Sequence, residues 1–162
     1  MIEQARQFAV TAHGNQRYGD RPYSFHLDAV AELATAYGDD ARIVAYLHDT
    51  VEDTAIELTE IETRFGERIA RCVAILTDAT GADRRERKAR TYHRMSQVDG
   101  DELLALIVKA ADRLANIKAC IDDDRQDKLA MYRNEHPAFR QAAYRPGLCD
   151  ALWAAMDRAL ES

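Results

Sequence analysis

The segment HDTVEDT, residues 48–54, concentrates groups that could carry out acid–base or metal chemistry. On a helix, His48 and Glu52 are four residues apart and share a face, and Asp49 and Asp53 share the neighbouring face. The apolar stretch IVAYL directly before them is typical of a buried helix. Acids and imidazoles crowded at the end of such a helix resist burial unless a cation compensates them. A divalent metal ion is the natural compensator, although His-Asp alone is also typical of a solvated helix end.

Two residues elsewhere in the chain favour the metal interpretation. His26 begins an expected helix within PYSFHLDAV, and Asp112 lies inside the apolar segment IVKAADRLANIK. An Asp flanked by Ala111 and Leu114 on a buried helix needs a partner. These two positions therefore add an imidazole and a carboxylate to the candidate set.

The order of these residues resembles a known superfamily. A His, then His-Asp, then a distant Asp, all on expected helices, is similar to the HD phosphohydrolases. The chain looks most like the hydrolase domain of RelA/SpoT homologues, and in particular the stand-alone small alarmone hydrolases. The matching segments are AHGNQRYGDRPYSFHLDAV (12–30), AYLHDTVEDT (45–54), EIETRFGERIA (60–70), LTDATG (76–81) and IVKAADRLANIK (107–118). The tail segment KLAMYR is similar to the closing helices of the small members.

The resemblance implies a metal site and a chemistry. Four positions match the family's metal ligands: His26, His48, Asp49 and Asp112. The family's usual metal is manganese, and a mixed nitrogen and oxygen set suits Mn²⁺, with Fe²⁺, Zn²⁺ and Mg²⁺ ranked behind it. The acidic pair beside the metal corresponds to Glu52 and Asp53, either of which would orient a water molecule or shuttle its proton.

The resemblance also implies a substrate. The family's signature reaction removes pyrophosphate from the 3′ position of guanosine tetra- or pentaphosphate. The candidates for holding the nucleotide and its phosphates are Arg17, Lys109, Arg113 and Asn116, of which Arg17 and Asn116 match family positions.

The sequence departs from the longer family members around the expected substrate site. Tyr18 stands where a cation is usual, Leu27 replaces a frequent proline, and Ala115 stands where a His or Tyr is common; Ala119 differs as well. These departures leave other nucleotides open, such as an adenine alarmone or NADPH. A catalytically silent nucleotide-binding regulator and an interaction module with a structural metal are the remaining alternatives.

Composition limits the classes of protein to which the chain can belong. It has 162 residues with 47% hydrophobic and 31% charged residues, which suits one globular domain, residues 1–162. The net charge of −6 disfavours nucleic acid as a partner. No apolar run approaches the roughly 20 residues of a membrane span, and the N-terminal segment does not read as a signal peptide, so we expect a cytoplasmic protein. The odd count of three cysteines disfavours a disulfide framework. A homo-oligomer stays open.

Helices must position all of these residues, because helical periodicity dominates the chain. We expect helices over residues 2–13, 25 to about 37, 41 to about 51, 67 to about 76, 101 to about 120, near 126–134 and 147–160, with a loop over residues 14–24 that contains Gly14, Gly19 and Pro22. No strand of useful length is expected. The predicted fold is therefore an all-α, irregular helical bundle of the HD-domain type.

Overall fold

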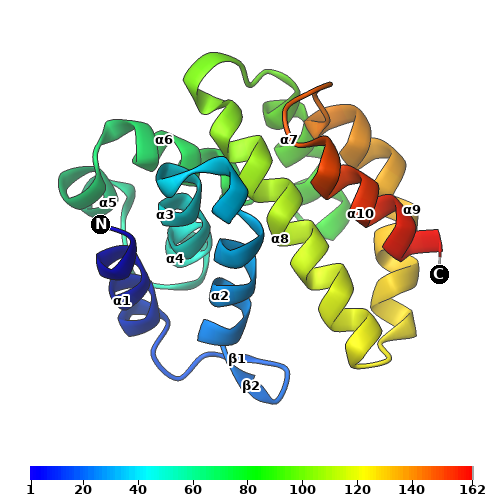
Figure 1. The fold of residues 1–162 in the computed structure, drawn as a ribbon, viewed down its shortest axis with the longest axis horizontal. Helices are drawn as coiled ribbons and strands as arrows, with labels where there is room; N and C mark the ends of the chain where they lie inside the picture. Colours follow the sequence, from blue (N-terminus) through cyan, green and yellow to red (C-terminus); the bar gives the residue numbers. More distant parts are fainter. Residues whose placement is uncertain (162) are drawn as a thin grey trace.

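The computed structural model describes residues 1–161, and most of them are helical (Figure 1). The all-α fold class is thus confirmed. The helices are α1 (Ile2–His13), α2 (Ser24–Leu33), α3 (Asp39–Leu47), α4 (Thr50–Asp53), α5 (Leu58–Phe65), α6 (Glu67–Leu76), α7 (Arg84–Ser96), α8 (Leu103–Asp122), α9 (Gln126–Ala143) and α10 (Asp150–Glu161). Short 3₁₀ turns occur at Thr35–Tyr37 and Gly100–Glu102.

Helix α8 is the central element of the bundle. It packs against α2, α3 and α6 on one side and against α9 and α10 on the other, and Figure 1 shows it crossing the middle of the molecule. Its apolar residues nearly surround it, so Leu106, Val108 and Ile117 are fully buried. A helix that is apolar on all sides is stable only inside a core. The polar residues Lys109, Asp112 and Arg113 in the middle of α8 are buried as well.

The segment that carries His48 and Asp49 is broken, which corrects the expected continuous helix from residue 41 to about 51. Helix α3 ends at Leu47, and the single-turn helix α4 begins at Thr50. The His48 side chain donates from Nδ1 to the Ala45 carbonyl (2.6 Å), and Thr50 Oγ1 donates to the Leu47 carbonyl (2.7 Å). Side chains thus bind carbonyls that a continuing helix would use, and such competition interrupts helices.

The expected loop over residues 14–24 contains a small hairpin instead of irregular chain alone. Strands β1 (Arg17–Tyr18) and β2 (Arg21–Pro22) pair antiparallel, with Tyr18 opposite Arg21. Gly19 lies in the turn with φ 62°, a conformation that costs glycine nothing. The two-residue strands are too short to show a period-2 pattern in the sequence.

Helix α9 is longer than the helix expected near residues 126–134. It continues through Pro137 to Ala143, because Phe139, Ala142 and Ala143 are buried against the core. Apolar packing of its second half therefore outweighs the hydrogen bond that the proline cannot donate. Helix α2 is shorter than expected: it ends at Leu33, and Thr35–Tyr37 form a 3₁₀ turn.

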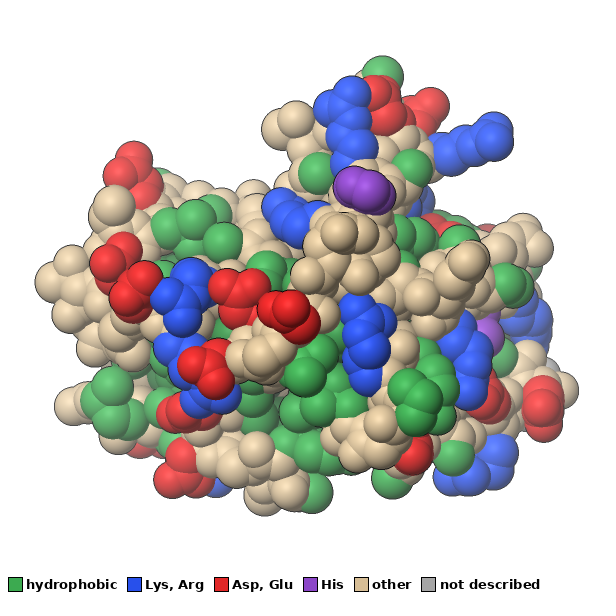
Figure 2. Space-filling model, turned by 90° about the horizontal axis from the view of Figure 1, so that it is seen from above, with side chains coloured by type: hydrophobic (Ala, Val, Ile, Leu, Met, Phe, Trp, Pro, Cys, Tyr) green, Lys and Arg blue, Asp and Glu red, His purple; other side chains and the backbone are tan. Residues whose placement is uncertain are grey.

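The three cysteines, Cys72, Cys120 and Cys149, are free and buried. Burial raises the pKa of the Cys72 and Cys149 thiols to about 11. Among the described residues, no helix is both long and apolar enough to cross a membrane. Acidic and basic side chains are interspersed over the face that Figure 2 shows.

Candidate metal centre

Three elements bring two imidazoles and two carboxylates together. His26 lies in the first turn of α2, His48 and Asp49 lie in the break between α3 and α4, and Asp112 lies in the middle of α8. His26 Nε2 is 3.2 Å from Asp112 Oδ1 and 3.8 Å from Asp49 Oδ2. His48 Nε2 is 3.0 Å from Asp49 Oδ2 and 3.4 Å from Asp112 Oδ1. One potential ligand atom from each of His26, His48 and Asp49 lies within 4.8 Å of the others, so this cluster could hold a metal ion.

The His48 ring is oriented as metal-binding histidines are. Its Nδ1 donates to the Ala45 carbonyl, so a neutral ring carries its lone pair on Nε2. That Nε2 is buried and has no hydrogen-bond partner among the described residues, although carboxylate oxygens of Asp49 and Asp112 lie 3.0 and 3.4 Å away. A buried, unpartnered nitrogen facing two carboxylates fits a divalent cation.

The electrostatics of the cluster also require a positive charge. Burial alone would lower the pKa of the His48 imidazole, but the carboxylates of Asp49 and Asp112 outweigh burial and raise it. The imidazole in turn holds the pKa of Asp49 below its ordinary range despite burial. A proton or a metal ion can therefore satisfy these groups, and the two compete.

Two residues expected at the substrate, Lys109 and Asn116, hold Asp112 in place. Lys109 Nζ donates to Asp112 Oδ2 (2.9 Å), and Asn116 Nδ2 donates to Asp112 Oδ1 (3.0 Å). Both lie one turn from Asp112 on α8, at spacings that place side chains on one face. Lys109 is buried, so it neutralises a buried carboxylate and also faces the cavity beside the cluster.

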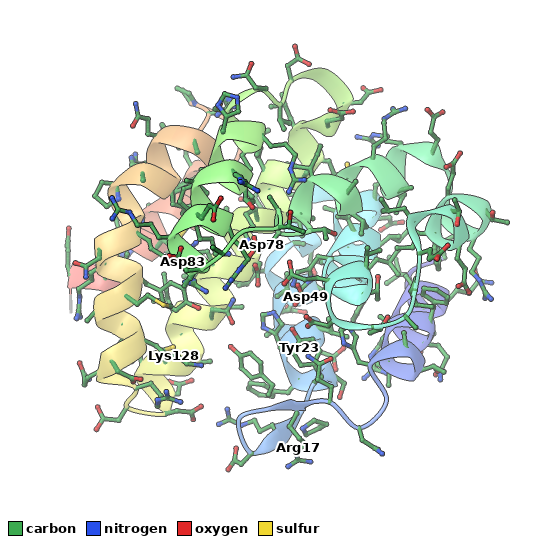
Figure 3. The ribbon with its side chains drawn as sticks, turned by 180° about the vertical axis from the view of Figure 1, so that it is seen from behind. Arg17, Tyr23, Asp49, Asp78, Asp83 and Lys128 are labelled. Atoms are coloured by element: carbon green, nitrogen blue, oxygen red, sulfur yellow. The ribbon has the colours of Figure 1, made fainter. Side chains whose placement is uncertain are left out.

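Two tyrosines lie beside the cluster; Tyr23 was not predicted from the sequence, and Tyr18 was noted only as a departure around the expected substrate site. The Tyr23 hydroxyl donates to Asp49 Oδ2 (2.5 Å), and Figure 3 shows Tyr23 pointing toward Asp49. The Tyr18 ring stacks on His26, with centroids 4.7 Å apart, and its hydroxyl donates to Asn116 Oδ1 (2.6 Å). Tyr23 lies only three residues before His26, which is the one sequence signal that could have indicated its role.

The acidic pair of α4 divides between two environments. Glu52 lines the cavity and accepts a hydrogen bond from the Asp78 backbone N–H (2.6 Å). Partial desolvation at the cavity raises the pKa of Glu52 although its side chain still reaches solvent, and the nearby Asp49 and Asp78 carboxylates add to this effect. Asp53, which is exposed like Glu52, does not line the cavity and accepts a hydrogen bond from Gln16 Nε2 (3.0 Å).

The cavity beside the cluster has a volume of about 170 Å³ and is polar. Its lining includes acidic and metal-site residues together with basic side chains from α7 and α8: Arg84, Lys88, Lys109 and Arg113. Lys88 pairs with Asp78 (2.8 Å), and Arg84 and Arg113 both pair with Glu135 of α9 (2.8 and 3.1 Å).

Part of this basic wall was not predicted from the sequence. Arg84 and Lys88 belong to the charged run of residues 82–90, whose mixed signs are also typical of a solvated helix face. Only their spacing of four residues, which places both on one side of α7, could have indicated a shared role. Arg17, in contrast, lies on the hairpin outside the cavity lining, and its guanidinium donates to the Asp20 carbonyl (Figure 3).

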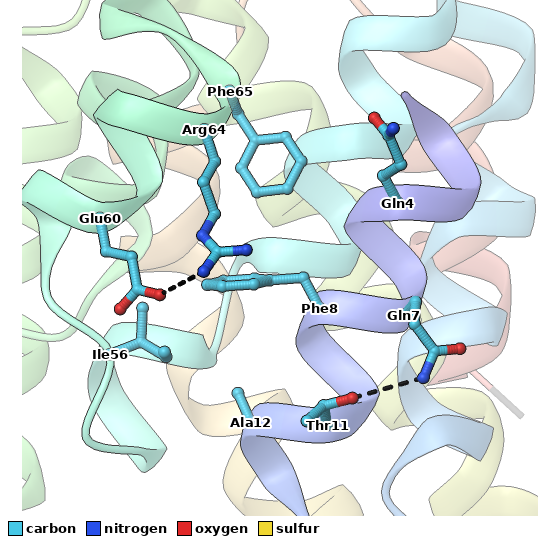
Figure 4. Close-up of a pocket in the computed structure, with 9 residues that line it drawn as sticks. All are labelled: Gln4, Gln7, Phe8, Thr11, Ala12, Ile56, Glu60, Arg64 and Phe65. Carbon is cyan, nitrogen blue, oxygen red and sulfur yellow. Dashed lines mark hydrogen bonds and ion pairs between the residues drawn. The ribbon is translucent and has the colours of Figure 1, made fainter.

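A second, larger cavity of about 670 Å³ lies between α1 and α5 and contains none of the predicted site residues. Phe8 and Phe65 form its apolar wall, and Arg64 lies over the Phe8 ring while pairing with Glu60 (Figure 4). The chemistry of the molecule is thus concentrated in the smaller, polar cavity.

Comparisons with known proteins agree with this geometry. The family described as HD domain matches residues 5–148. The guanosine-3′,5′-bis(diphosphate) 3′-pyrophosphohydrolase of Aquifex aeolicus is 33% identical over 134 residues, which cover 80% of this chain and 19% of that protein. The probable enzyme of the same name from Synechocystis is 32% identical over 97% of this chain and 21% of its own length. The chain thus spans about a fifth of the length of these curated relatives.

Shorter proteins are similar as well. The guanosine-3′,5′-bis(diphosphate) 3′-pyrophosphohydrolase MESH1 of Danio rerio is 35% identical over 118 residues, 68% of this chain and 64% of that protein. A solved structure described as a metazoan ortholog of SpoT that hydrolyzes ppGpp has the same fold, with a TM-score of 0.78 and 21% identity over 99% of this chain and 93% of that one. The family match over most of the chain and the identity of these relatives lead to one conclusion: the chain belongs to the HD domain family.

Proposed function

We propose that this chain is a metal-dependent phosphohydrolase that releases pyrophosphate from the 3′ position of guanosine tetra- or pentaphosphate, leaving GDP or GTP. The observation that carries the proposal is the convergence of two imidazoles and two carboxylates at the edge of a cavity with a basic wall. The proposed metal ligands are His26, His48, Asp49 and Asp112. The names of the relatives support this substrate.

The donor set favours Mn²⁺ as the resident ion. Two imidazole nitrogens and two carboxylate oxygens suit manganese, and four protein ligands leave positions open on an octahedral ion. When bound, such an ion would polarise a phosphoryl oxygen and make a water molecule more acidic.

The protein's own groups supply the remaining chemistry. Glu52 faces the cavity and has a raised pKa, which makes its carboxylate a stronger base, so it is suited to accept a proton from the attacking water. Lys109, Lys88, Arg84 and Arg113 present cationic donors to the pyrophosphate group and neutralise charge in the transition state. Asn116 lines the cavity and accepts a hydrogen bond from Tyr18, so we assign the nucleotide to this side of the cavity.

The substrate, the cytoplasmic location and the action of residues 1–162 as one hydrolase domain are parts of the same proposal. Tyr18 occupies a position where the longer family members carry a cation, so the identity of the nucleotide needs a direct test. Other nucleotides, including an adenine alarmone and NADPH, are the alternatives for a comparison panel.

The decisive experiment is hydrolysis of guanosine tetraphosphate by chelator-stripped protein, with and without added Mn²⁺, beside the Asp49→Ala variant. We expect GDP and pyrophosphate only from the unmutated protein and only with metal. Absence of turnover would refute this substrate, and turnover of another nucleotide in the panel would reassign it. Absence of turnover with every nucleotide, together with tight nucleotide binding, would favour a regulator.

A further inference from the structure

The Gln16 side chain joins the end of α1 to the acidic residue at the end of α4. Its Nε2 donates to Asp53 Oδ2 (3.0 Å), and its Oε1 lies 2.8 Å from His13 Nδ1. This is the one hydrogen bond of the Asp53 carboxylate within the described chain. The exposed Asp53 therefore depends on Gln16 for a defined side-chain position.

His13 sets the orientation of the Gln16 amide. Because Gln16 donates from Nε2 to a carboxylate, its Oε1 must face His13, which must then donate from Nδ1. His13 is only 6% exposed, and its Nε2 has no hydrogen-bond partner among the described residues. Burying an imidazole nitrogen without a partner costs free energy, and the hydrogen bond from His13 Nδ1 to Gln16 offsets part of that cost.

The backbone holds the same residues in register with the metal cluster. Gln16 N–H donates to the His13 carbonyl (3.0 Å), and the Gln16 carbonyl accepts from Tyr23 N–H (3.1 Å). The His13 ring also packs on the Tyr23 ring, with centroids 4.4 Å apart, and Tyr23 donates to Asp49. Gln16 and Tyr23, joined by a backbone hydrogen bond across the base of the hairpin, thus donate to two acids four residues apart, Asp53 and Asp49.

We propose that Gln16 is a positioning residue that holds Asp53 for the reaction and that His13 acts through Gln16 by fixing its amide. The inference rests on the proposed function and on the expectation from the sequence that Asp53 acts with Glu52 beside the metal. Without the Gln16 amide, the Asp53 carboxylate at the end of a single helical turn is free to rotate into solvent. The chemical step then loses an oriented acid, while substrate and metal binding keep their own residues.

The Gln16→Met variant tests the proposal because it keeps the side-chain length and removes the amide. We expect kcat to fall about tenfold, with KM for guanosine tetraphosphate and Kd for Mn²⁺ within about twofold of the unmutated protein. Gln7→Met is the matched control, since it makes the same change on α1 at an exposed glutamine whose side chain donates to Thr11. It should leave kcat, KM and the melting temperature unchanged.

A mutant cycle separates positioning from a structural role. In an Asp53→Asn background, Gln16→Met should cause no further loss of kcat, because the residue that it positions is already disabled. His13→Asn retains a donor near the Nδ1 position and should keep at least about half of the activity, whereas His13→Leu should resemble Gln16→Met. If His13→Leu fails to fold, His13→Asn and the Gln16–Asp53 cycle still decide.

A crystal structure of Gln16→Met separates failure of this inference from failure of the proposed function. We expect the Asp53 carboxylate to leave its position while the metal cluster stays unchanged. An unmoved Asp53, a kcat within about twofold of the unmutated protein, or a full loss of about tenfold that persists in the Asp53→Asn background would overturn the inference. If the unmutated protein does not turn over guanosine tetraphosphate, the proposed function fails and the position of Asp53 alone decides the inference.

Discussion

The two ring nitrogens of His48 have separate tasks. Nδ1 is committed to the Ala45 carbonyl, and Nε2 faces the carboxylates of Asp49 and Asp112. Those carboxylates raise the pKa of His48 against the effect of its burial. In the metal-free protein they therefore favour a proton at the place where we expect the ion.

Proton and metal should compete at this site. Below the raised pKa of His48, an ion must displace a proton, so the apparent Kd for Mn²⁺ should rise as pH falls, approaching about tenfold per pH unit for one displaced proton. Calorimetric titration at several pH values measures the slope. His136→Gln is the control, because His136 also pairs with an acid, Asp157 (2.7 Å), but belongs to α9 and does not line the cavity. This variant should leave the pH dependence of Mn²⁺ binding unchanged. An affinity that did not change with pH would contradict the assignment of His48 as a ligand.

Glu52 should matter for the rate far more than for metal binding. The Glu52→Gln variant keeps an oxygen that can accept from the Asp78 N–H but loses the proton acceptor, so we expect kcat to fall about 10²- to 10⁴-fold. The Kd for Mn²⁺ should change little, since Glu52 is not among the proposed ligands. Glu60→Gln, on the surface of α5, should leave kcat unchanged. If Glu52→Gln were nearly as active as the unmutated protein, the proton would have to be handled elsewhere.

Residue types and order, together with the resemblance to the HD phosphohydrolases, selected the candidate metal cluster; buried His and Asp side chains on apolar helices need a charged partner or a metal ion. The partners of these residues were harder to predict. Tyr23, Lys88 and Arg84 are ordinary helix or loop residues until folding places them beside Asp49 and Asp78. Such long-range neighbours depend on how helices cross, which a single sequence does not specify.

At the scale of elements, α8 determines both stability and site geometry. Leu106 is fully buried on this helix, six residues before Asp112. Leu106→Ala should lower the free energy of unfolding by about 2–5 kcal/mol, because it removes buried methyl groups and leaves a cavity. Urea unfolding followed by circular dichroism measures this loss. Leu103→Ala, at a partly buried position of the same helix, should cost less; an equal cost would mean that burial does not set the difference.

The helices that were easiest to predict are those whose apolar pattern agrees with their packing. Helix α1 has the predicted bounds, and α8 has nearly the predicted ones. The break at His48 was not predictable from periodicity, because side-chain hydrogen bonds to Ala45 and Leu47 decide it. The length of α9 depends on burial of Phe139, a tertiary effect that overrides the local signal of Pro137.

At the scale of the whole molecule, the core does not depend on the metal cluster. The apolar contacts of α2, α3, α6, α8 and α10 form one continuous cluster of buried side chains. Removing the ion with a chelator should therefore abolish turnover while the far-ultraviolet circular dichroism keeps its helical shape. The free energy of unfolding should fall only by the contribution of metal binding, roughly a few kcal/mol at saturating metal. The melting temperature should fall accordingly. Complete unfolding on chelation would instead favour a structural metal in an interaction module.

The reactivity of the three buried thiols can report local opening of the folded protein. Cys72 lies in α6, Cys120 near the end of α8, and Cys149 in the turn before α10. A maleimide reagent cannot reach these sulfurs in the closed protein, so each can be modified only when its region opens. Three labelling rates, followed by mass spectrometry, would therefore report three local opening equilibria without any added dye or engineered site. If substrate slows modification of Cys120 but not of Cys72, binding rigidifies α8 selectively, and the thiols would map how far ligand binding is felt through the bundle.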